Sequence, residues 1–231
     1  MSKNKNNNKK INIFFDFANT ICFLKKRREL ILSKFLKKFK VQRNNDELAN
    51  TFKKADERFF YSDLKKIVTK KNFYVEYNRF IQKRLKLNFI KNFSLDYYYY
   101  VKNIKNNWII DKETIKILRF KQKKYNFYLA SNFSLYAFKI LNKYKIRDIF
   151  KEIYISKDIG LEKPNKNFYK YIINHSQVIP RDSYFIGDNY ILDHKVPRLF
   201  RFKTALITSC KEKRILNFKN IKSFFKYIEK K

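Results

Sequence analysis

Ile11-Asn-Ile-Phe-Phe-Asp-Phe-Ala-Asn-Thr20 carries the clearest fold signal in this 231-residue chain. Its first five residues form a short, mostly apolar run that stops abruptly at Asp16. Runs of this kind are typical of strands that are buried on both faces of a parallel sheet. We therefore predict a first strand over residues 11–15, with a carboxylate at its carboxyl end.

Similar apolar runs return only after a long interval. They predict further strands at residues 125–130, 152–155, 184–186 and 205–207, and apolar residues at helical spacing predict helices at 111–124, 136–144 and 167–174. Asp111 has the position and chemistry of an N-cap for the first of these helices. Because strands and helices alternate, we predict a doubly wound α/β fold with a parallel sheet.

The interval itself, residues 21–106, has a different pattern. Long charged segments carry apolar residues at helical spacing, such as Leu24, Leu30, Ile31, Phe35 and Phe39, and no strand is evident. We predict four helices here. The predicted organisation is a Rossmann-like core of residues 11–20 and 107–231, a helical cap domain over residues 21–106 inserted after the first strand, and a disordered basic tail over residues 1–10.

The chain contains two glycines, and each opens a short polar motif: Gly160-Leu-Glu-Lys163-Pro164, and Gly187-Asp188 followed by Asp193. Glycine accepts positive φ and allows close approach of other groups to the backbone. The two glycines therefore predict two tight turns facing one anionic site.

Two residues of these motifs, together with Asp16 and Ser131, lie at the ends of predicted strands or helices. Asp16 ends the first strand, Ser131 ends the second, Asp188 ends a later one, and Lys163 is predicted to start a helix. Open α/β sheets bind ligands at the carboxyl ends of their strands. We therefore expect these side chains to converge.

With these motifs in this order, the chain resembles the haloacid dehalogenase-like (HAD) hydrolase superfamily, specifically the members with a helical cap inserted between the first and second motifs. The matching residues are Asp16-Phe-Ala-Asn-Thr20, Ser131-Asn132, Gly160-x-x-Lys163-Pro164 and Gly187-Asp188-x-x-x-x-Asp193. Each motif alone is a weak or moderate signal. The ordered set spans nearly the whole chain and is specific.

The resemblance implies a Mg²⁺-dependent hydrolase of small phosphorylated metabolites. Asp16 would be the nucleophile and form an aspartyl-phosphate intermediate, which splits one difficult displacement into two easier ones. The negative phosphoryl group requires cations and hydrogen-bond donors around it. The ammonium of Lys163 and the hydroxyl of Ser131 would act beside the metal ion in this role.

The resemblance also implies the ligands of the metal ion and the residues behind them. Mg²⁺ would be bound by Asp16, Asp188 and the backbone carbonyl of Ala18. Three further residues would support these groups without binding the metal ion. Asp193 would orient Lys163 or a metal-bound water, and Thr20 would fix the loop through a side-chain hydrogen bond. Asn132 would support the second motif.

Ala18 departs from the pattern of the phosphatases in this superfamily, which usually carry a second Asp at this position as general acid and base. Loss of a proton donor typically slows a reaction with a poor leaving group by about 10²- to 10⁴-fold. The enzyme could use leaving groups that need no proton, such as acyl or aryl phosphates, recruit an acid from the cap, or be slow.

Dehalogenases and phosphonate-cleaving relatives also lack the second Asp, so both activities stay open as alternatives. Dehalogenases usually lack the metal-binding Asp of the last motif, which is present here as Asp188. Phosphonate hydrolases typically carry Arg where this chain has Lys163. Phosphate chemistry is therefore the favoured hypothesis.

The net charge of +35 suggests a different class of function, the binding of nucleic acid or another polyanion. The abundant residue types, Lys, Asn, Ile, Phe and Tyr, all have codons made of A and T, and the basic residues run from Lys3 to Lys231 rather than gathering on one element. Genomic composition is thus the favoured explanation. A catalytically weak protein that binds RNA through its basic surface remains the alternative.

Cys22 and Cys210 are far apart and predict neither a disulfide framework nor a zinc site. We expect both to be small core residues in a reducing compartment. No segment has the roughly 20 apolar residues of a membrane helix, and residues 1–10 do not resemble a secretory signal. The expectation is a cytoplasmic protein with no membrane partner, and the sequence predicts no particular oligomeric state.

Overall fold

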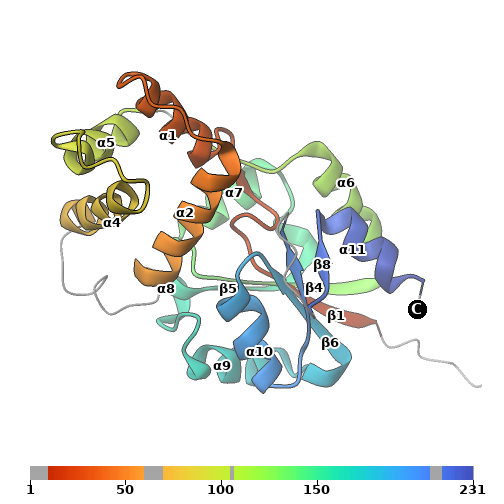
Figure 1. Ribbon diagram of the computed structural model, residues 1–231. Coiled ribbons are helices and arrows are strands. Elements are labelled where there is room, and N and C mark those ends of the chain that lie inside the picture. Colours follow the sequence, from red (N-terminus) through yellow and green to blue (C-terminus); the bar gives the residue numbers. More distant parts are fainter. Residues whose placement is uncertain (1–9, 60–69, 105–106, 209–214, 231) are drawn as a thin grey trace, which may run out of the picture. The chain divides into compact units, whose positions relative to one another are not determined.

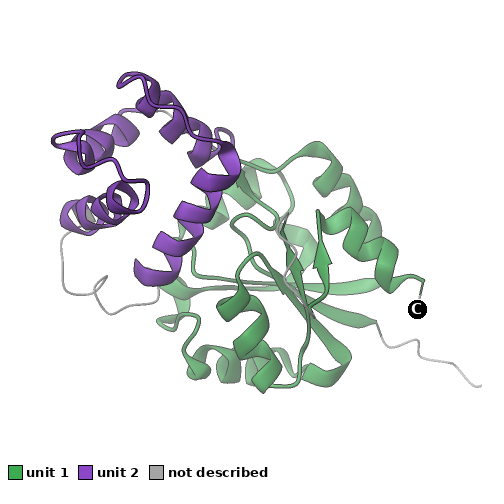
Figure 2. Cartoon of the chain, viewed as in Figure 1, with its two compact units in different colours: residues 1–23, 108–231 green, residues 24–107 purple. Residues whose placement is uncertain are grey.

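The computed structural model describes residues 10–59, 70–104, 107–208 and 215–230. The chain divides into two compact units, Met1–Phe23 with Trp108–Lys231 as the first and Leu24–Asn107 as the second (Figure 2). The predicted tail falls almost wholly on residues 1–9, which lie outside the described ranges, as does Cys210. Cys22 is a buried free thiol, as expected.

A six-stranded sheet forms the centre of the first unit (Figure 1). Its strand order is β5-β4-β1-β6-β7-β8, and every neighbouring pair is parallel. The strands are β1 (Ile11–Phe15), β4 (Tyr125–Ser131), β5 (Phe150–Ile155), β6 (Ser183–Gly187), β7 (Lys203–Ile207) and β8 (Asn217–Phe218). The predicted α/β class with a parallel sheet is confirmed.

Helices cover both faces of this sheet because its strands carry apolar side chains on both sides. Ile13 and Phe15 pack in one core cluster with residues of α6 (Lys112–Lys121), α7 (Tyr136–Lys143) and α11 (Ile221–Ile228). Phe14, which points to the opposite face, packs with residues of α9 (Lys166–Ser176) and its surroundings. Burial on both faces explains why the strands appear in the sequence as continuous apolar runs.

The order of the strands creates a switch point at the centre of the sheet. The chain moves outward from β1 to β4 and β5, and then returns to place β6 on the other side of β1. Phe15 of β1 is paired with Leu129 on one side and Ile186 on the other. The carboxyl ends of β1, β4 and β6 therefore lie side by side, where folds of this type form their binding crevice.

The second unit is helical and has its own apolar core. Its described helices are α1 (Arg28–Lys37), α2 (Asn45–Phe59), α4 (Lys70–Arg84) and α5 (Phe93–Lys102). Arg28 forms an ion pair of 2.7 Å with Asp56, whose carboxylate also accepts a hydrogen bond of 2.6 Å from the Tyr77 hydroxyl. This network ties α1 to α2 and α4.

The expectation of no strand in residues 21–106 was wrong at one edge. β2 (Phe23–Leu24) pairs with β3 (Trp108–Ile109) as a separate two-stranded sheet. Two residues are too few to show an alternating pattern, so hydrophobic periodicity could not reveal them. None of the described helices is long and apolar enough to cross a membrane.

Several element boundaries follow from capping. The Asp111 carboxylate accepts a hydrogen bond of 2.8 Å from the Thr114 backbone N–H, which confirms the predicted N-cap of α6. This helix ends at Lys121, three residues before the predicted end. Helix α11, which begins with a capping box between Asn220 and Ser223, was not predicted from the sequence. The remaining short helices are α8 (Ser156–Ile159), α10 (Val196–Leu199), η1 (Arg147–Ile149), η2 (Pro180–Asp182) and the π-helix η3 (Tyr190–Lys195).

Candidate active site

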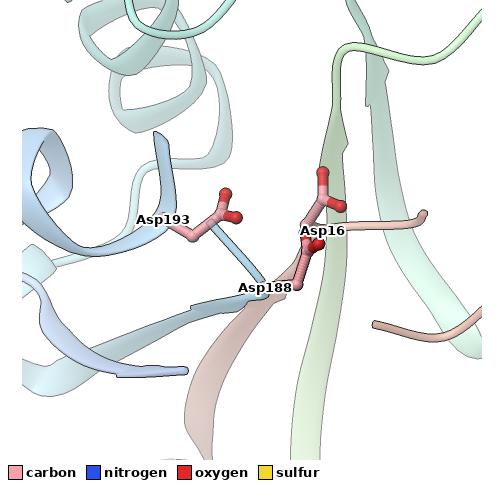
Figure 3. A group of neighbouring side chains, drawn as sticks. All are labelled: Asp16, Asp188 and Asp193. Atoms are coloured by element: carbon pink, nitrogen blue, oxygen red, sulfur yellow. The ribbon is translucent and has the colours of Figure 1, made fainter. Parts of the chain in front are cut away.

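Three carboxylates meet at the switch point of the sheet (Figure 3). Asp16 follows β1 directly, Asp188 follows β6 directly, and Asp193 lies within η3. One oxygen from each carboxylate lies within 4.8 Å of the others, a spacing that could hold a metal ion. Asp16 and Asp193 are buried, and Asp188 is partly exposed.

Lys163 supplies the positive charge that joins two of these carboxylates. Its Nζ donates hydrogen bonds to Asp16 Oδ1 at 2.8 Å and to Asp193 Oδ1 at 2.6 Å, and its side chain is fully buried. The prediction that Lys163 starts a helix was wrong, because α9 begins three residues later, at Lys166. Pro164 disfavours the helical conformation in the residue before it, so Lys163 lies in a loop.

Asn132 holds the backbone of this loop at two points. Its Oδ1 accepts a hydrogen bond of 2.8 Å from the Lys163 N–H, and its Nδ2 donates one of 2.6 Å to the Lys163 carbonyl. A single amide side chain thus satisfies both polar groups of one residue. Since Asn132 follows Ser131 at the end of β4, it anchors the Lys163 loop to the sheet.

The two glycines have different structural roles. Gly160 has a φ of +72° and ends α8 in the left-handed conformation, as expected for a glycine turn. Gly187 is not in the positive-φ conformation, and glycine is needed there for the close approach of another group instead. A Cβ at Gly187 would lie 2.1 Å from Asp193 Cγ, so glycine is required for the close approach of this carboxylate.

The Asp193 carboxylate is held from two sides. Besides Lys163, it accepts a hydrogen bond of 3.0 Å from the backbone N–H of Asn189 at Oδ2. The Asn189 side chain in turn caps η3 by accepting hydrogen bonds from the backbone N–H groups of Ile191 and Leu192. Asn189 was not among the residues predicted from the sequence, although an Asn before a helix is a common N-cap.

Asn19 is a second residue that the sequence analysis missed. It has a φ of 56°, in the left-handed region that Asn tolerates better than most residues, and its Nδ2 donates a hydrogen bond of 3.1 Å to Asp188 Oδ2. This contact links the loop after β1 to the end of β6. The Asn within Asp16-x-x-Asn-Thr20 was the available signal.

The other predicted site residues lie in the same region. Ser131 is the last residue of β4 and is buried, and Ala18 forms an isolated bridge with Cys22 in the loop after Asp16. Thr20 is also buried, but its Oγ1 has no hydrogen-bond partner among the described residues, so the expected side-chain bond is absent. Backbone bonds already close this turn, since Ile21 and Cys22 both donate to the Phe17 carbonyl.

The charges of the cluster perturb one another strongly. Burial raises the pKa of Asp188 to about 8, with repulsion from Asp16 and Asp193 as a further cause, and burial likewise raises the pKa of Asp193 to about 6. Burial alone would lower the pKa of Lys163, but the attraction of Asp16 and Asp193 outweighs it and raises this pKa. Two of the three carboxylates contact the one ammonium, and with all three ionised the cluster would carry an excess of negative charge.

The two histidines form hydrogen bonds with residues outside this cluster. His194 Nδ1 lies 2.7 Å from the Thr204 hydroxyl on β7, and His175 Nδ1 lies 3.1 Å from Glu152 on β5. Burial lowers the pKa of His194. Its imidazole therefore favours the neutral form in this structural contact.

Comparison with known proteins identifies the family. The model of the haloacid dehalogenase-like hydrolase family matches residues 12–194, which confirms the resemblance noted in the sequence. No curated protein sequence matches the chain significantly.

Solved structures of low sequence identity share the fold. YfnB from Bacillus subtilis, solved bound to magnesium, is 17% identical with a TM-score of 0.62, over 95% of this chain and 99% of its own. A HAD phosphatase from Thermococcus onnurineus is 15% identical with a TM-score of 0.56, over 94% and 97%. A 2-haloacid dehalogenase from Pseudomonas syringae pv. tomato is 10% identical with a TM-score of 0.54, over 95% and 98%.

Proposed function

The chain belongs to the haloacid dehalogenase-like hydrolase family, and from this premise we propose that it is a Mg²⁺-dependent phosphohydrolase of small phosphorylated metabolites. The observation that carries this proposal is the cluster in which buried Lys163 bridges Asp16 and Asp193 while Asp188 lies beside them. Such a cluster combines a nucleophile, a fixed cation and an acidic metal site. Phosphoryl transfer through an aspartyl-phosphate intermediate can use all three.

The donor set fits Mg²⁺. This ion prefers oxygen ligands and is usually bound by one or two carboxylates together with water and substrate oxygens. Asp16, Asp188 and the backbone carbonyl of Ala18 would hold it. Burial, and after it repulsion from Asp16 and Asp193, raises the pKa of Asp188, and a bound cation would offset that repulsion. When bound, the ion supplies positive charge that offsets the charge of the phosphoryl oxygens.

In the proposed reaction, a carboxylate oxygen of Asp16 forms a bond to phosphorus as the bond from phosphorus to the leaving oxygen breaks, and that oxygen departs with the electron pair and takes a proton from water. Water then attacks the phosphorus of the aspartyl phosphate, which releases inorganic phosphate and restores the carboxylate. The Lys163 ammonium stabilises charge on the phosphoryl oxygens, and the Ser131 hydroxyl donates a hydrogen bond to one of them. Asp193 keeps Lys163 in place, whereas the methyl group of Ala18 transfers no proton.

Carbon–halogen cleavage is the second candidate, because a 2-haloacid dehalogenase shares the fold. An Asp16 carboxylate could equally attack carbon in such a substrate. The third carboxylate of the site, Asp188, favours the phosphate reaction. Displacement of halide by the Asp16 carboxylate gives no role to Asp188 or to the cation that Asp188 would bind.

A screen of the purified protein with Mg²⁺ against phosphorylated metabolites tests the proposal, with release of inorganic phosphate as the readout. Asp16→Asn should abolish this release. The matched control is Asp182→Asn, which changes an exposed carboxylate in η2 and should leave release unchanged. Equal activity of wild type and folded Asp16→Asn would exclude Asp16 as nucleophile, and release of halide without metal would favour the dehalogenase alternative.

A further inference from the structure

Three aromatic rings form a packed group, and two of them lie within two positions of proposed catalytic residues in the sequence. The Phe133 ring lies edge-on to Phe17, with centroids 5.2 Å apart, and edge-on to Trp108, with centroids 5.0 Å apart. Phe17 directly follows Asp16, and Phe133 lies two residues after Ser131. We call Phe17, Trp108 and Phe133 the aromatic shelf.

The aromatic shelf runs from the core toward the surface. Phe17 is fully buried and belongs to the main core of the first unit, whereas Trp108 and Phe133 are partly exposed and pack against that core. The next apolar residues in the chain, Leu135 and Tyr136, are 52% and 49% exposed. Exposed and partly exposed apolar residues thus follow the carboxyl end of β4, at the edge of the sheet where the charged cluster lies.

We infer that the aromatic shelf binds the leaving group of the substrate and that the substrate is an aryl phosphate monoester. This inference rests on the proposed phosphohydrolase function and specifies its substrate class. Ligand sites typically combine apolar and aromatic walls with a few fixed polar groups. Here the cluster of Asp16 and Lys163 would take the phosphoryl group, while Trp108 and Phe133 would pack edge-on or offset against the aromatic ring.

The chemistry of the leaving group agrees with this arrangement. Attack by Asp16 forms an oxygen–phosphorus bond and breaks the bond from phosphorus to the aryl oxygen, which departs with the electron pair as an aryloxide and takes a proton from water. A phenolic oxygen has a pKa of about 10, as in tyrosine. It therefore leaves as an anion more readily than an alkoxide and does not require the proton that Ala18 cannot give.

A binding experiment separates this inference from catalysis. In the Asp16→Asn variant with Mg²⁺, phenyl phosphate and cyclohexyl phosphate present the same phosphoryl group on rings of similar size, of which one is aromatic. We expect phenyl phosphate to bind about 2- to 10-fold more tightly. Trp108 is the one tryptophan of the chain, so its fluorescence should change with phenyl phosphate and much less with cyclohexyl phosphate.

Two further variants locate the preference. Phe133→Leu keeps Trp108 as the reporter and should bring the ratio of the two affinities to about 1. Phe120→Leu, which replaces a 67% exposed ring on α6 outside the aromatic shelf, should keep the ratio unchanged. Equal binding of the two esters to Asp16→Asn alone would overturn the inference, so the test does not depend on the folding of any shelf variant.

The proposed function has a separate readout. Wild-type protein that releases phosphate from alkyl monoesters with Mg²⁺, but shows no preference for phenyl phosphate in binding, would support the phosphohydrolase and refute the aryl substrate. Wild-type protein that releases no phosphate from any monoester would refute the phosphohydrolase. A binding preference that disappears in Phe133→Leu would still support the aromatic shelf as a ligand site.

Discussion

The Asp193 carboxylate occupies the space in which any side chain at Gly187 would lie. A Cβ built on Gly187 falls 2.1 Å from both Cγ and Oδ2 of Asp193, and contacts this short do not occur in folded proteins. Because Asp193 also holds Lys163, the absence of a side chain at the end of β6 is a condition for the geometry of the whole cluster.

Gly187→Ala should therefore displace Asp193 and weaken its hydrogen bonds to Lys163 and to the Asn189 N–H. We expect a loss of about 1–3 kcal/mol in the free energy of unfolding, as for other overpacked sites, together with a loss of the proposed phosphatase activity. Urea denaturation and phosphate release measure the two effects.

Gly160→Ala is the matched control. A Cβ at Gly160 meets no atom within 4 Å, and the cost comes only from its φ of +72°, about 1–2 kcal/mol of backbone strain. This variant should lose stability but retain more activity than Gly187→Ala. Equal losses of activity would contradict the role assigned to Gly187.

Asn132→Leu should disturb the Lys163 loop without removing any group that contacts substrate. The variant keeps the size of the side chain but loses both hydrogen bonds to the Lys163 backbone. We expect kcat/KM to fall about 10- to 100-fold, as is typical when residues that orient a site are replaced. Asn165→Ala, which removes the N-cap of α9 near the same loop, should cost about 1 kcal/mol of stability with a smaller effect on kcat/KM.

The affinity for Mg²⁺ should rise with pH. The pKa of Asp188 is raised to about 8, so below that pH the ion must displace a proton, and affinity should fall about tenfold for each pH unit. Calorimetric titration between pH 6 and 9 measures this slope. Asp188→Asn should bind Mg²⁺ weakly and lose the slope, and a pH-independent affinity of the wild type would contradict the prediction.

The same raised pKa predicts the pH dependence of stability in the absence of metal. The folded state holds a proton on Asp188 up to about pH 8, whereas the unfolded chain releases it near 3.8. Since the native state binds more protons between these values, its stability should fall as pH rises through this window. The increase in melting temperature on addition of Mg²⁺ should therefore be larger at pH 8.5 than at pH 6. An equal increase at both values would argue against Asp188 as a metal ligand.

Ala18→Asp should place a proton donor beside Asp16, the proposed nucleophile. We expect turnover of alkyl phosphates to rise by up to about 10²- to 10⁴-fold, and turnover of aryl phosphates to rise much less because their leaving group needs no proton. Steady-state rates on both substrate classes test this. Equal gains on the two classes would show that the missing carboxylate does not limit the reaction.

The alternation of strands and helices could be predicted from the sequence, because it depends on the polarity and capping of neighbouring residues. The apolar run before Asp16 and the similar runs at β4 and β6 define buried strands, and Asp111 caps α6 as its position indicates. The short strands β2 and β8 were missed because two residues cannot display a period.

The sequence alone determined that this chain is an α/β protein with Asp16 and Asp188 at the ends of strands and a lysine in a Gly-x-x-Lys-Pro motif, because periodicity, capping and short motifs are properties of neighbouring residues. Only the tertiary structure decided how these residues meet. The Lys163 ammonium contacts Asp16, which is 147 positions away in the sequence, and Asp193, which is 30 positions away. Asn132 accepts a hydrogen bond from the Lys163 backbone N–H. The roles of Asn19 and Gly187 likewise depend on tertiary contacts, of Asn19 with Asp188 and of Gly187 with Asp193. Such contacts depend on the order of the strands in the sheet, and no local pattern encodes that order.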